Sequence, residues 1–518
     1  MCLNLITEEQ SSLKLSQLFI RRPDLDKTSR VKIAVIAKYF KRHGTVTRLA
    51  AKYEISRSFV YILAGQLSQL VDNWLETDTV PAEYLNYLDK VENLKRLFRY
   101  RLIGGCSISK CSTLLKADEV KNTSFGWCSE QLQLAGSQLP NMVAWQGSAI
   151  YASDEIYYAQ NKPILITVEP VSGAILRIDK EPRLTKQGWQ AHWTALKEQG
   201  ITPTLLVRDE GRALIAAQKE VLEEVPFQAD TFHAITHKLC QIEQTLQRKA
   251  LQAMENEYYS QGVFHRAVTP ANISNKKNKY EQAKAKTIVA LSLLEDFQWL
   301  YHCLRSQLRV IRTDGTVRDR QIAEQEVRTA LELMKLLPIE TTKVIKHIEG
   351  LMPHLFGFLD RAVEQVEKVS ATIADYLLPF WLAYWQYQRS LINIKATAAR
   401  KKLIQRFEYL QPLLEQECEV LQQSFEIQKA TVFAHLNTIV QSSSMVESAN
   451  ARIRPFISEM KGQISQAMLN LVMFYHNHCQ FKRGKRKGFA PIELLKNQKL
   501  EKNWLELLLD IVCPEPSA

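Results

Sequence analysis

The chain has 518 residues, of which 46% are hydrophobic and 24% are charged, and its formal net charge is +12. This composition excludes a globally disordered chain, and the length predicts several domains. The basic excess favours a polyanionic partner, nucleic acid before membrane. Nine cysteines without a CxxC pair indicate neither a zinc ribbon nor a disulfide framework, so we expect a reducing compartment.

The N-terminus lacks the basic-then-apolar order of a secretory signal. The longest aromatic and apolar run, near residues 376–385, is too short to span a bilayer. We therefore expect a cytoplasmic protein that makes no membrane contact.

Helical spacing begins near Ser29, and a short second helix is predicted at residues 48–53. After a break, Ser56 is placed to cap a third helix that extends towards Leu70. This order predicts an all-α helix-turn-helix domain that binds DNA, although a plain three-helix bundle has the same pattern. The side chains expected to reach base edges lie at the exposed start of the third helix: Arg57, Ser58 and Tyr61.

A second helical region follows. Residues 94–103 form a basic amphipathic pattern that ends at two glycines, and helices are predicted at residues 108–115 and 124–134. The pattern fits a second helix-turn-helix unit and a linker bundle equally well.

Three β-rich runs lie between residues 148 and 177, and the first carries Asp154 where its alternation ends. A helical pattern and a fourth β-rich run follow, and this fourth run ends at Asp209. Strands that alternate with helices predict an α/β layer with a partly parallel sheet. Asp179 follows the third run, and the sequence assigns it no role.

From about Leu239 to His435 the pattern is helical, with an Asn- and Lys-rich loop predicted at residues 269–279. An all-α block between two parts of an α/β core is an insertion. A later helix carries Glu447, and Pro455 is expected to interrupt it.

Together these patterns predict seven segments in chain order: a leader (1–29), a helix-turn-helix domain (30–75), a second helical region (76–146), the first part of an α/β core (147–238), an all-α insertion domain (239–435), the second part of the core (436–480), and a basic tail with a final helix (481–518).

Asp154, Asp209 and Glu447 are the predicted catalytic and metal-binding residues. Two Mg²⁺ (or Mn²⁺) ions can activate an attacking oxygen and stabilise a leaving oxygen at a phosphodiester, and carboxylates supply the hard oxygen ligands that they prefer. Each residue also has a simpler interpretation, because strand-end aspartates often cap turns and Glu447 could be a solvated helix residue. Glu155 and Glu210, which alternation points to the opposite face, are the substitutes if the register differs.

Further residues are predicted to support this site. Asn450 and Arg454 share a helix face with Glu447, so Asn450 could orient a carboxylate and Arg454 could hold a phosphate. Asp230 and His233 follow a short strand, where we expect a supporting role or, for His233, simple packing.

Two other features point to nucleic acid. The basic run Lys482, Arg483, Lys485, Arg486 and Lys487 is predicted to contact DNA backbone, with nuclear targeting and a solvated tail as alternatives. In the insertion, Trp299, Trp381 and Trp385 could stack on an unpaired base, although helical spacing favours core packing.

The assembled residues resemble those of bacterial insertion-sequence transposases with an RNase H-like DDE core and an all-helical insertion. The stretches that carry the resemblance are ASDEIYY (152–158), KPILITVEPVS (162–172), RDEG (208–211), DTFH (230–233), SSMVESAN (443–450) and FKRGKRKGFAPIELL (481–495). Membership would imply that Asp154, Asp209 and Glu447 are the metal-binding triad. Asp230 stands where related transposases carry a cysteine, which separates this chain from their Cys-x-x-His pattern.

The resemblance implies a transposase that binds the terminal inverted repeats of a transposon as an oligomer, cleaves the DNA and joins it to target DNA, in a bacterial cytoplasm near the nucleoid. The alternatives are a DNA-binding regulator derived from a transposase, without catalysis, and an RNase H-like nuclease that does not transpose.

Overall fold

The computed structural model describes residues 24–40, 42, 44–75, 82–120, 123–393 and 397–514, so residues 1–23 of the predicted leader lie outside the described part. The chain divides into two compact units. The first comprises Met1–Lys95 with Cys513–Ala518, and the second comprises Arg96–Val512.

The first unit is all-α. Its helices are α2 (Lys27–Tyr39), α3 (Thr45–Lys52), α4 (Arg57–Leu75) and the first part of α5 (Ala82–Phe98). Apolar side chains that include Ile33, Leu49 and Leu63 form its core. The hydroxyl of Ser56 accepts a hydrogen bond from the Phe59 amide at 3.1 Å, which confirms the predicted cap of the third helix.

Only the part of the predicted second helical region from Arg96 onward belongs to the second unit. It contains a π-helical turn (Arg99–Ile103), α6 (Ile108–Ala117) and α7 (Phe125–Ser137). α7 packs closely on α19 (Gln466–His478), and a Cβ on Gly136 would lie 1.9 Å from the Ala467 carbonyl oxygen. This packing commits one face of α7 to the core, and both alternatives for the region stay predictions.

One mixed sheet of five strands has the order β3-β2-β1-β4-β5. β1 pairs antiparallel with β2, and β2 with β3, whereas β4 runs parallel to both β1 and β5. The strands are β1 (Gly147–Ala159), β2 (Lys162–Glu169), β3 (Ala174–Lys180), β4 (Ile201–Arg208) and β5 (Phe227–Ala229). This arrangement confirms the predicted α/β layer.

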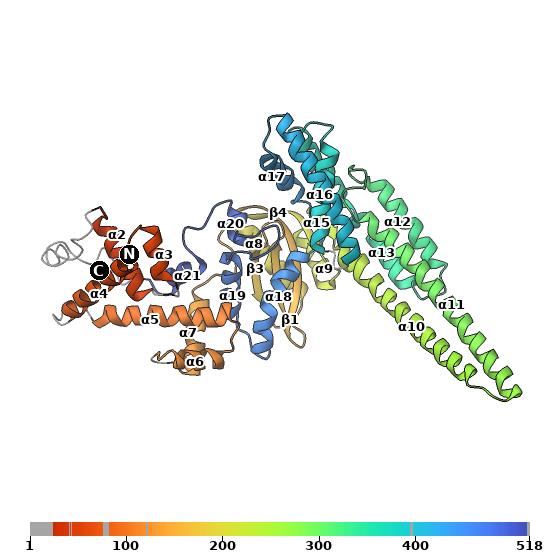
Figure 1. The fold of residues 1–518 in the computed structure, drawn as a ribbon, viewed down its shortest axis with the longest axis horizontal. Helices are drawn as coiled ribbons and strands as arrows, with labels where there is room; N and C mark the ends of the chain where they lie inside the picture. Colours follow the sequence, from red (N-terminus) through yellow and green to blue (C-terminus); the bar gives the residue numbers. More distant parts are fainter. Residues whose placement is uncertain are drawn as a thin grey trace. The chain divides into compact units, whose positions relative to one another are not determined.

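Helices cover both faces of the sheet. α8 (Lys186–Glu198) contacts β3 and β4 and is followed, after β4, by α9 (Arg212–Val221). α18 (Ser444–Glu459) contacts β1 and β2 (Figure 1). The expectation that Pro455 interrupts this helix is wrong, because α18 continues through it while Val446, Ile453 and Phe456 stay buried. Packing of this apolar face offsets the hydrogen bond that proline removes.

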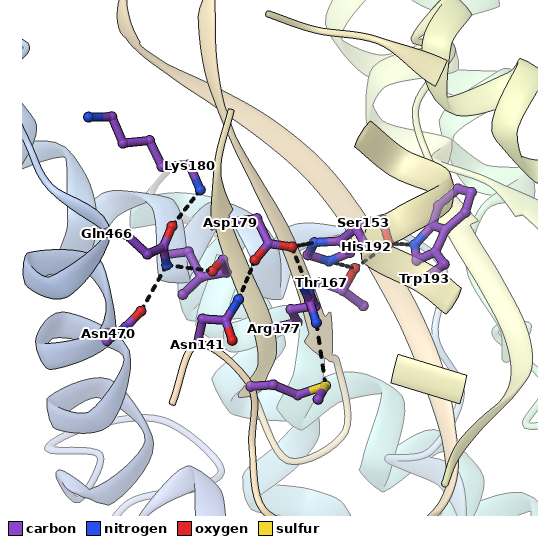
Figure 2. Close-up of polar contacts among 12 residues, drawn as sticks. Asn141, Ser153, Thr167, Arg177, Asp179, Lys180, His192, Trp193, Gln466 and Asn470 are labelled. Carbon is purple, nitrogen blue, oxygen red and sulfur yellow. Dashed lines mark hydrogen bonds and ion pairs between the residues drawn. The ribbon is translucent and has the colours of Figure 1, made fainter. Parts of the chain in front are cut away.

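A polar network lies between the sheet and α8 (Figure 2). His192 Nδ1 lies 2.7 Å from Asp179 Oδ2, and His192 Nε2 lies 2.9 Å from the Thr167 hydroxyl. That hydroxyl is 2.9 Å from the Ser153 hydroxyl, which also accepts a hydrogen bond from the Trp193 indole. The network therefore joins α8 to β1, β2 and β3.

The outer edge of β3 is closed by the backbone of residues 141–143, which bonds Leu176 and Ile178, and by side chains of α19. Gln466 donates to the Ile178 carbonyl and accepts from the Lys180 amide (Figure 2), and Asn477 bonds both backbone groups of Ile175. These bonds satisfy an edge that would otherwise be open to pairing with another strand.

The insertion is a helical domain with its own hydrophobic core, in which Trp381 and Trp385 are fully buried. Within the described residues no helix is long and apolar enough to cross a membrane. The insertion helices are α10 (Lys238–His265), α11 (Pro270–Gln307), α12 (Arg320–Lys335), α13 (Thr342–Leu355), α14 (Gly357–Ser370), α15 (Leu378–Asn393), α16 (Thr397–Val420) and α17 (Phe425–Leu436); the chain ends with α20 (Pro491–Lys496) and α21 (Trp504–Val512).

The predicted loop at residues 269–279 is wrong, because these residues form the first turns of α11. Pro270 occupies the first turn, where its missing amide costs nothing. α11 then runs antiparallel to α10 (Figure 1). Phe264 at the end of α10 stacks on Tyr280 of α11. Packing between the two helices outweighs the low helix propensity of asparagine.

Candidate metal centre and nucleic-acid contacts

Asp154, inside β1, and Asp209, directly after the end of β4, lie at the same level of two neighbouring parallel strands. The last register pair of β1 and β4 joins Ser153 to Arg208, so the next residue on each strand is an aspartate. Asp209 Oδ1 accepts from the Gly211 amide at 2.9 Å, as the start of α9 turns away from the sheet. The two carboxylates predicted from the strand patterns are therefore brought together.

α18 supplies the third group of side chains. The amide nitrogen of Asn450 donates to Asp154 Oδ2 at 3.1 Å, which confirms that α18 packs over the aspartates. The amide of Glu155 donates to Asp154 Oδ1 at 2.8 Å, so both oxygens of Asp154 are fixed. Asn450 is fully buried, and its side-chain oxygen has no hydrogen-bond partner.

The charges of this site are poorly compensated. Burial, and then the nearby charge of Asp209, raise the pKa of Asp154 to about 7. Burial, followed by the charges of Asp209 and Asp154, raises the pKa of Glu155 to about 8. These shifts mean that the carboxylates carry negative charge at a cost, which a cation would relieve.

Glu155 and Glu210, the substitute ligands, are placed differently from each other. The carboxylates of Glu155 and Asp209 both lie beside Gly211, the residue before α9. A Cβ on Gly211 would stand 3.6 Å from Glu155 Oε1 and 3.3 Å from Asp209 Oδ1, so Glu155 approaches the site from the side of α9. Glu210 is directed into the insertion, where it lies 2.6 Å from His347 Nε2.

Glu447 stands at the outer part of the site. Its carboxylate lies 3.9 Å from His233 Nε2 and 3.6 Å from Arg454, so the predicted helix face of α18 is present. The Glu447 side chain is about half exposed, unlike the buried Asn450. His233 sits in a π-helical turn (Phe232–His237) between β5 and α10, a local distortion that is frequent at functional sites.

Asp230 joins the two segments that connect the insertion to the core, one before α10 and one before α18. Its Oδ1 accepts from the amides of Phe232 and His233 at 2.8 and 3.1 Å, and its Oδ2 accepts from the amide and hydroxyl of Ser443. Ser443 immediately precedes α18. Asp230 thus acts on the site by positioning the helix that carries Glu447.

The donor chemistry fits a hard cation. The available oxygens come from Asp154, Asp209 and Glu155, and the unpartnered buried oxygens of Asn450 and Glu155 mark polar space inside the site. Within the described residues, no three His, Cys, Asp or Glu side chains converge into a closed metal-binding group. The site in this structure is a half-buried pair of aspartates, with Glu447 held nearby by His233 and Arg454.

The predicted base-reading residues are exposed at the start of α4. Arg57 and Ser58 are exposed, and Tyr61 is 54% exposed. They follow the short break between α3 and α4, as the predicted order of helices requires. Their contact with DNA stays a prediction.

The C-terminal basic run divides into two kinds of residue. Lys482, Arg483 and Lys487 are exposed, and their contact with DNA stays a prediction. Lys485 donates to the Asn437 carbonyl at 3.4 Å, and burial of its ammonium group lowers its pKa to about 7. Arg486 is used within the fold, because its guanidinium donates to the Pro170 and Val171 carbonyls and lies over Phe481. Of the insertion tryptophans, only Trp299 is exposed, so it remains the base-stacking candidate.

Sequence reasoning missed Asp179 and its network. Although burial alone would raise it, hydrogen bonds from His192 and Arg177 lower the pKa of Asp179 to about 2. Burial lowers the pKa of His192 despite that neighbour. The only signal in the sequence was an aspartate and a histidine thirteen positions apart, which is no motif.

The chain matches no protein-family model and no curated protein sequence. Its site is therefore interpreted from its own geometry.

Proposed function

We propose that the chain is a DDE-type DNA transposase that binds transposon ends and catalyses metal-dependent DNA cleavage and strand transfer. The observation that carries the proposal is the placement of Asp154 and Asp209 directly after the last register pair of β1 and β4, with Asp154 bonded to Asn450 of α18, the helix that also bears Glu447. Carboxylates from two strands and one helix form the ligand set that phosphodiester chemistry needs.

The sheet supports an RNase H-like core. β1, the first of three antiparallel strands, carries Asp154, and Asp209 follows the parallel strand β4. The helical insertion then separates β5 from α18, which carries Glu447. This is the order in which the resemblance to insertion-sequence transposases places the three acidic residues.

Two Mg²⁺ (or Mn²⁺) ions, when bound, would supply an activated attacking oxygen and neutralise charge on the leaving oxygen. Asp154 and Asp209 would hold them, with Glu447 as the third carboxylate. Asn450 and the Glu155 amide fix both oxygens of Asp154 in advance, which limits the reorganisation that binding requires. Arg454, whose side chain is 61% exposed beside Glu447, is available to a DNA phosphate.

The test is a nicking and strand-transfer assay on a plasmid that carries the DNA flanking the gene. The wild-type chain should cleave in Mg²⁺ and not in EDTA, and Asp154→Asn, Asp209→Asn and Glu447→Gln should each abolish cleavage. Glu198→Gln, which changes an exposed carboxylate at the end of α8, is the matched control and should cleave normally.

Cleavage that survives in all three variants would exclude this site. A chain that binds the flanking DNA and never cuts it would instead favour the DNA-binding regulator. Cutting without joining at the ends would favour a nuclease that does not transpose.

A further inference from the structure

The part of the insertion formed by α10 and α11 is strongly basic. Between Arg248 and Lys286 there are eight lysine and arginine side chains and three glutamates. The two helices lie side by side over this length (Figure 1), and the Thr287 hydroxyl donates to the Ala253 carbonyl at 3.0 Å. The paired helices therefore present a positive surface that the predicted catalytic residues do not use.

A hollow of about 430 Å³ lies between the helices on this surface. Three lysines line it, Lys249 from α10 and Lys279 and Lys286 from α11, together with the amides of Gln252, Asn256 and Gln282. No carboxylate lines the hollow. All three lysines are exposed, and within the described residues none of them forms an ion pair.

We infer that this hollow, the lysine groove, binds the sugar–phosphate backbone of a DNA duplex. Unpaired ammonium groups beside neutral amide donors suit phosphate oxygens, and they give affinity without reading sequence. From Lys249 to Ser260 the groove extends about 16 Å along α10, long enough to follow several phosphates of one strand. Tyr258 and Tyr259, 80% and 70% exposed, add aromatic surface at its distal end.

The inference rests on the proposed function, because that function makes DNA the partner. It adds a DNA-binding surface far along the chain from both the helix-turn-helix and the C-terminal basic run. The groove would hold DNA whether or not chemistry occurs, so binding can be measured with catalysis switched off.

The experiment measures duplex binding by fluorescence anisotropy as a function of salt, in EDTA, with every protein carrying Asp154→Asn. The test variant is Lys249→Gln, Lys279→Gln and Lys286→Gln together. The matched control is Lys343→Gln, Lys346→Gln and Lys368→Gln, which removes three exposed lysines from α13 and α14 of the same domain.

The groove variant should bind more weakly and should lower the slope of log affinity against log salt by about 3, about one for each phosphate that the groove no longer neutralises. The control should keep the wild-type slope, and an all-arginine version of the groove should restore it. Single Lys279→Gln should lower the slope by about 1 if the triple variant is misfolded by circular dichroism.

Equal slopes for the groove variant and the control would overturn the inference. So would a groove variant that binds the duplex normally and loses self-association, since a second copy would then be the partner. If the chain with its native Asp154 does not cleave DNA, but the groove variant still shows a lower salt slope than the control, the result counts against the proposed function and not against the groove.

Discussion

Ser153 and Asp154 are neighbours on β1 and lie on opposite faces of the sheet. The two faces differ in whether their buried polar groups have hydrogen-bond partners. On the α8 face, the Ser153 hydroxyl joins a closed network in which Thr167, His192 and Asp179 all have partners. On the α18 face, Asp154 shares its surroundings with Asp209, and the buried oxygen of Asn450 has no partner. On the α8 face, polar groups hold the strands and the helix together. On the α18 face, the like charges of Asp154 and Asp209 lie close together, which lowers stability.

This difference separates structural from functional polar residues on physical grounds. A satisfied buried network makes a core rigid and specific. Uncompensated carboxylates persist only where something else favours them, which is why strongly perturbed pKa values cluster at functional sites. Four predictions test the difference between the two faces, from the largest effect to the smallest.

The largest effect concerns catalysis. Asp209→Asn should reduce Mg²⁺-dependent cleavage at least about a thousandfold, because a neutral amide binds a hard cation poorly. Initial rates on the plasmid substrate measure this, alongside His192→Gln, which should retain most activity at a temperature where it is folded. Comparable loss in both variants would mean that the two faces do not have separate roles.

The second prediction concerns stability. His192→Ala removes the group that joins Asp179 to Thr167 and leaves both buried, so it should lower the free energy of unfolding by about 3 kcal/mol. Urea unfolding followed by circular dichroism measures the change. Asn450→Ala is the counterpart on the other face and should cost less, since one of its polar atoms is already unpartnered.

The third prediction has a pH dependence. Because the pKa of Asp154 rises from 3.8 to about 7 on folding, the folded state binds more protons than the unfolded state between these values, and stability falls as pH rises through them. Asp154→Asn removes this penalty. In EDTA it should stabilise the chain by about 2 kcal/mol at pH 8 and progressively less towards pH 4.

Thermal unfolding at several pH values, with Glu198→Gln as the control, measures that trend. A stabilisation that is the same at every pH would show that Asp154 ionisation does not cause it.

The smallest effect tests whether the faces communicate through β1. Ser153→Ala removes a hydroxyl bonded to Thr167 and Trp193, so it should cost about 1 kcal/mol of stability. Cleavage should stay within about twofold of wild type, since Asp154 is fixed by Asn450 and the Glu155 amide instead. A large loss of activity in a folded variant would contradict the separation of the two faces.

The sequence indicated the α18 face more readily than the α8 face. Asp154 and Asp209 could be placed because β-rich runs are visible as local patterns, and Glu447 shares a helix face with Asn450 by simple spacing. Asp179 could not be assigned, since its partner Asn141 lies 38 residues away and nothing local marks the pair.

The same cause explains two further limits of local patterns. A supporting role was expected for Asp230, but the sequence could not show its partner, because its bonds to Ser443 span 213 residues and only the folded topology creates them. Residues 269–279 were predicted as a loop from their asparagines and lysines, and packing on α10 makes residues 270–279 helical. Local propensity fails where distant contacts decide the conformation.

The bonds from Asp230 to Ser443 have a consequence for how the insertion could have entered this chain during evolution. The Thr231 amide also donates to the Gln441 carbonyl, so a stretch of about two hundred residues departs and returns through two backbone segments in direct contact. Its endpoints are as close as those of a tight turn, and the core tolerates its length at little entropic cost. The helical domain is in effect a cassette, which recombination could exchange or shorten while the sheet and its aspartates stay in register.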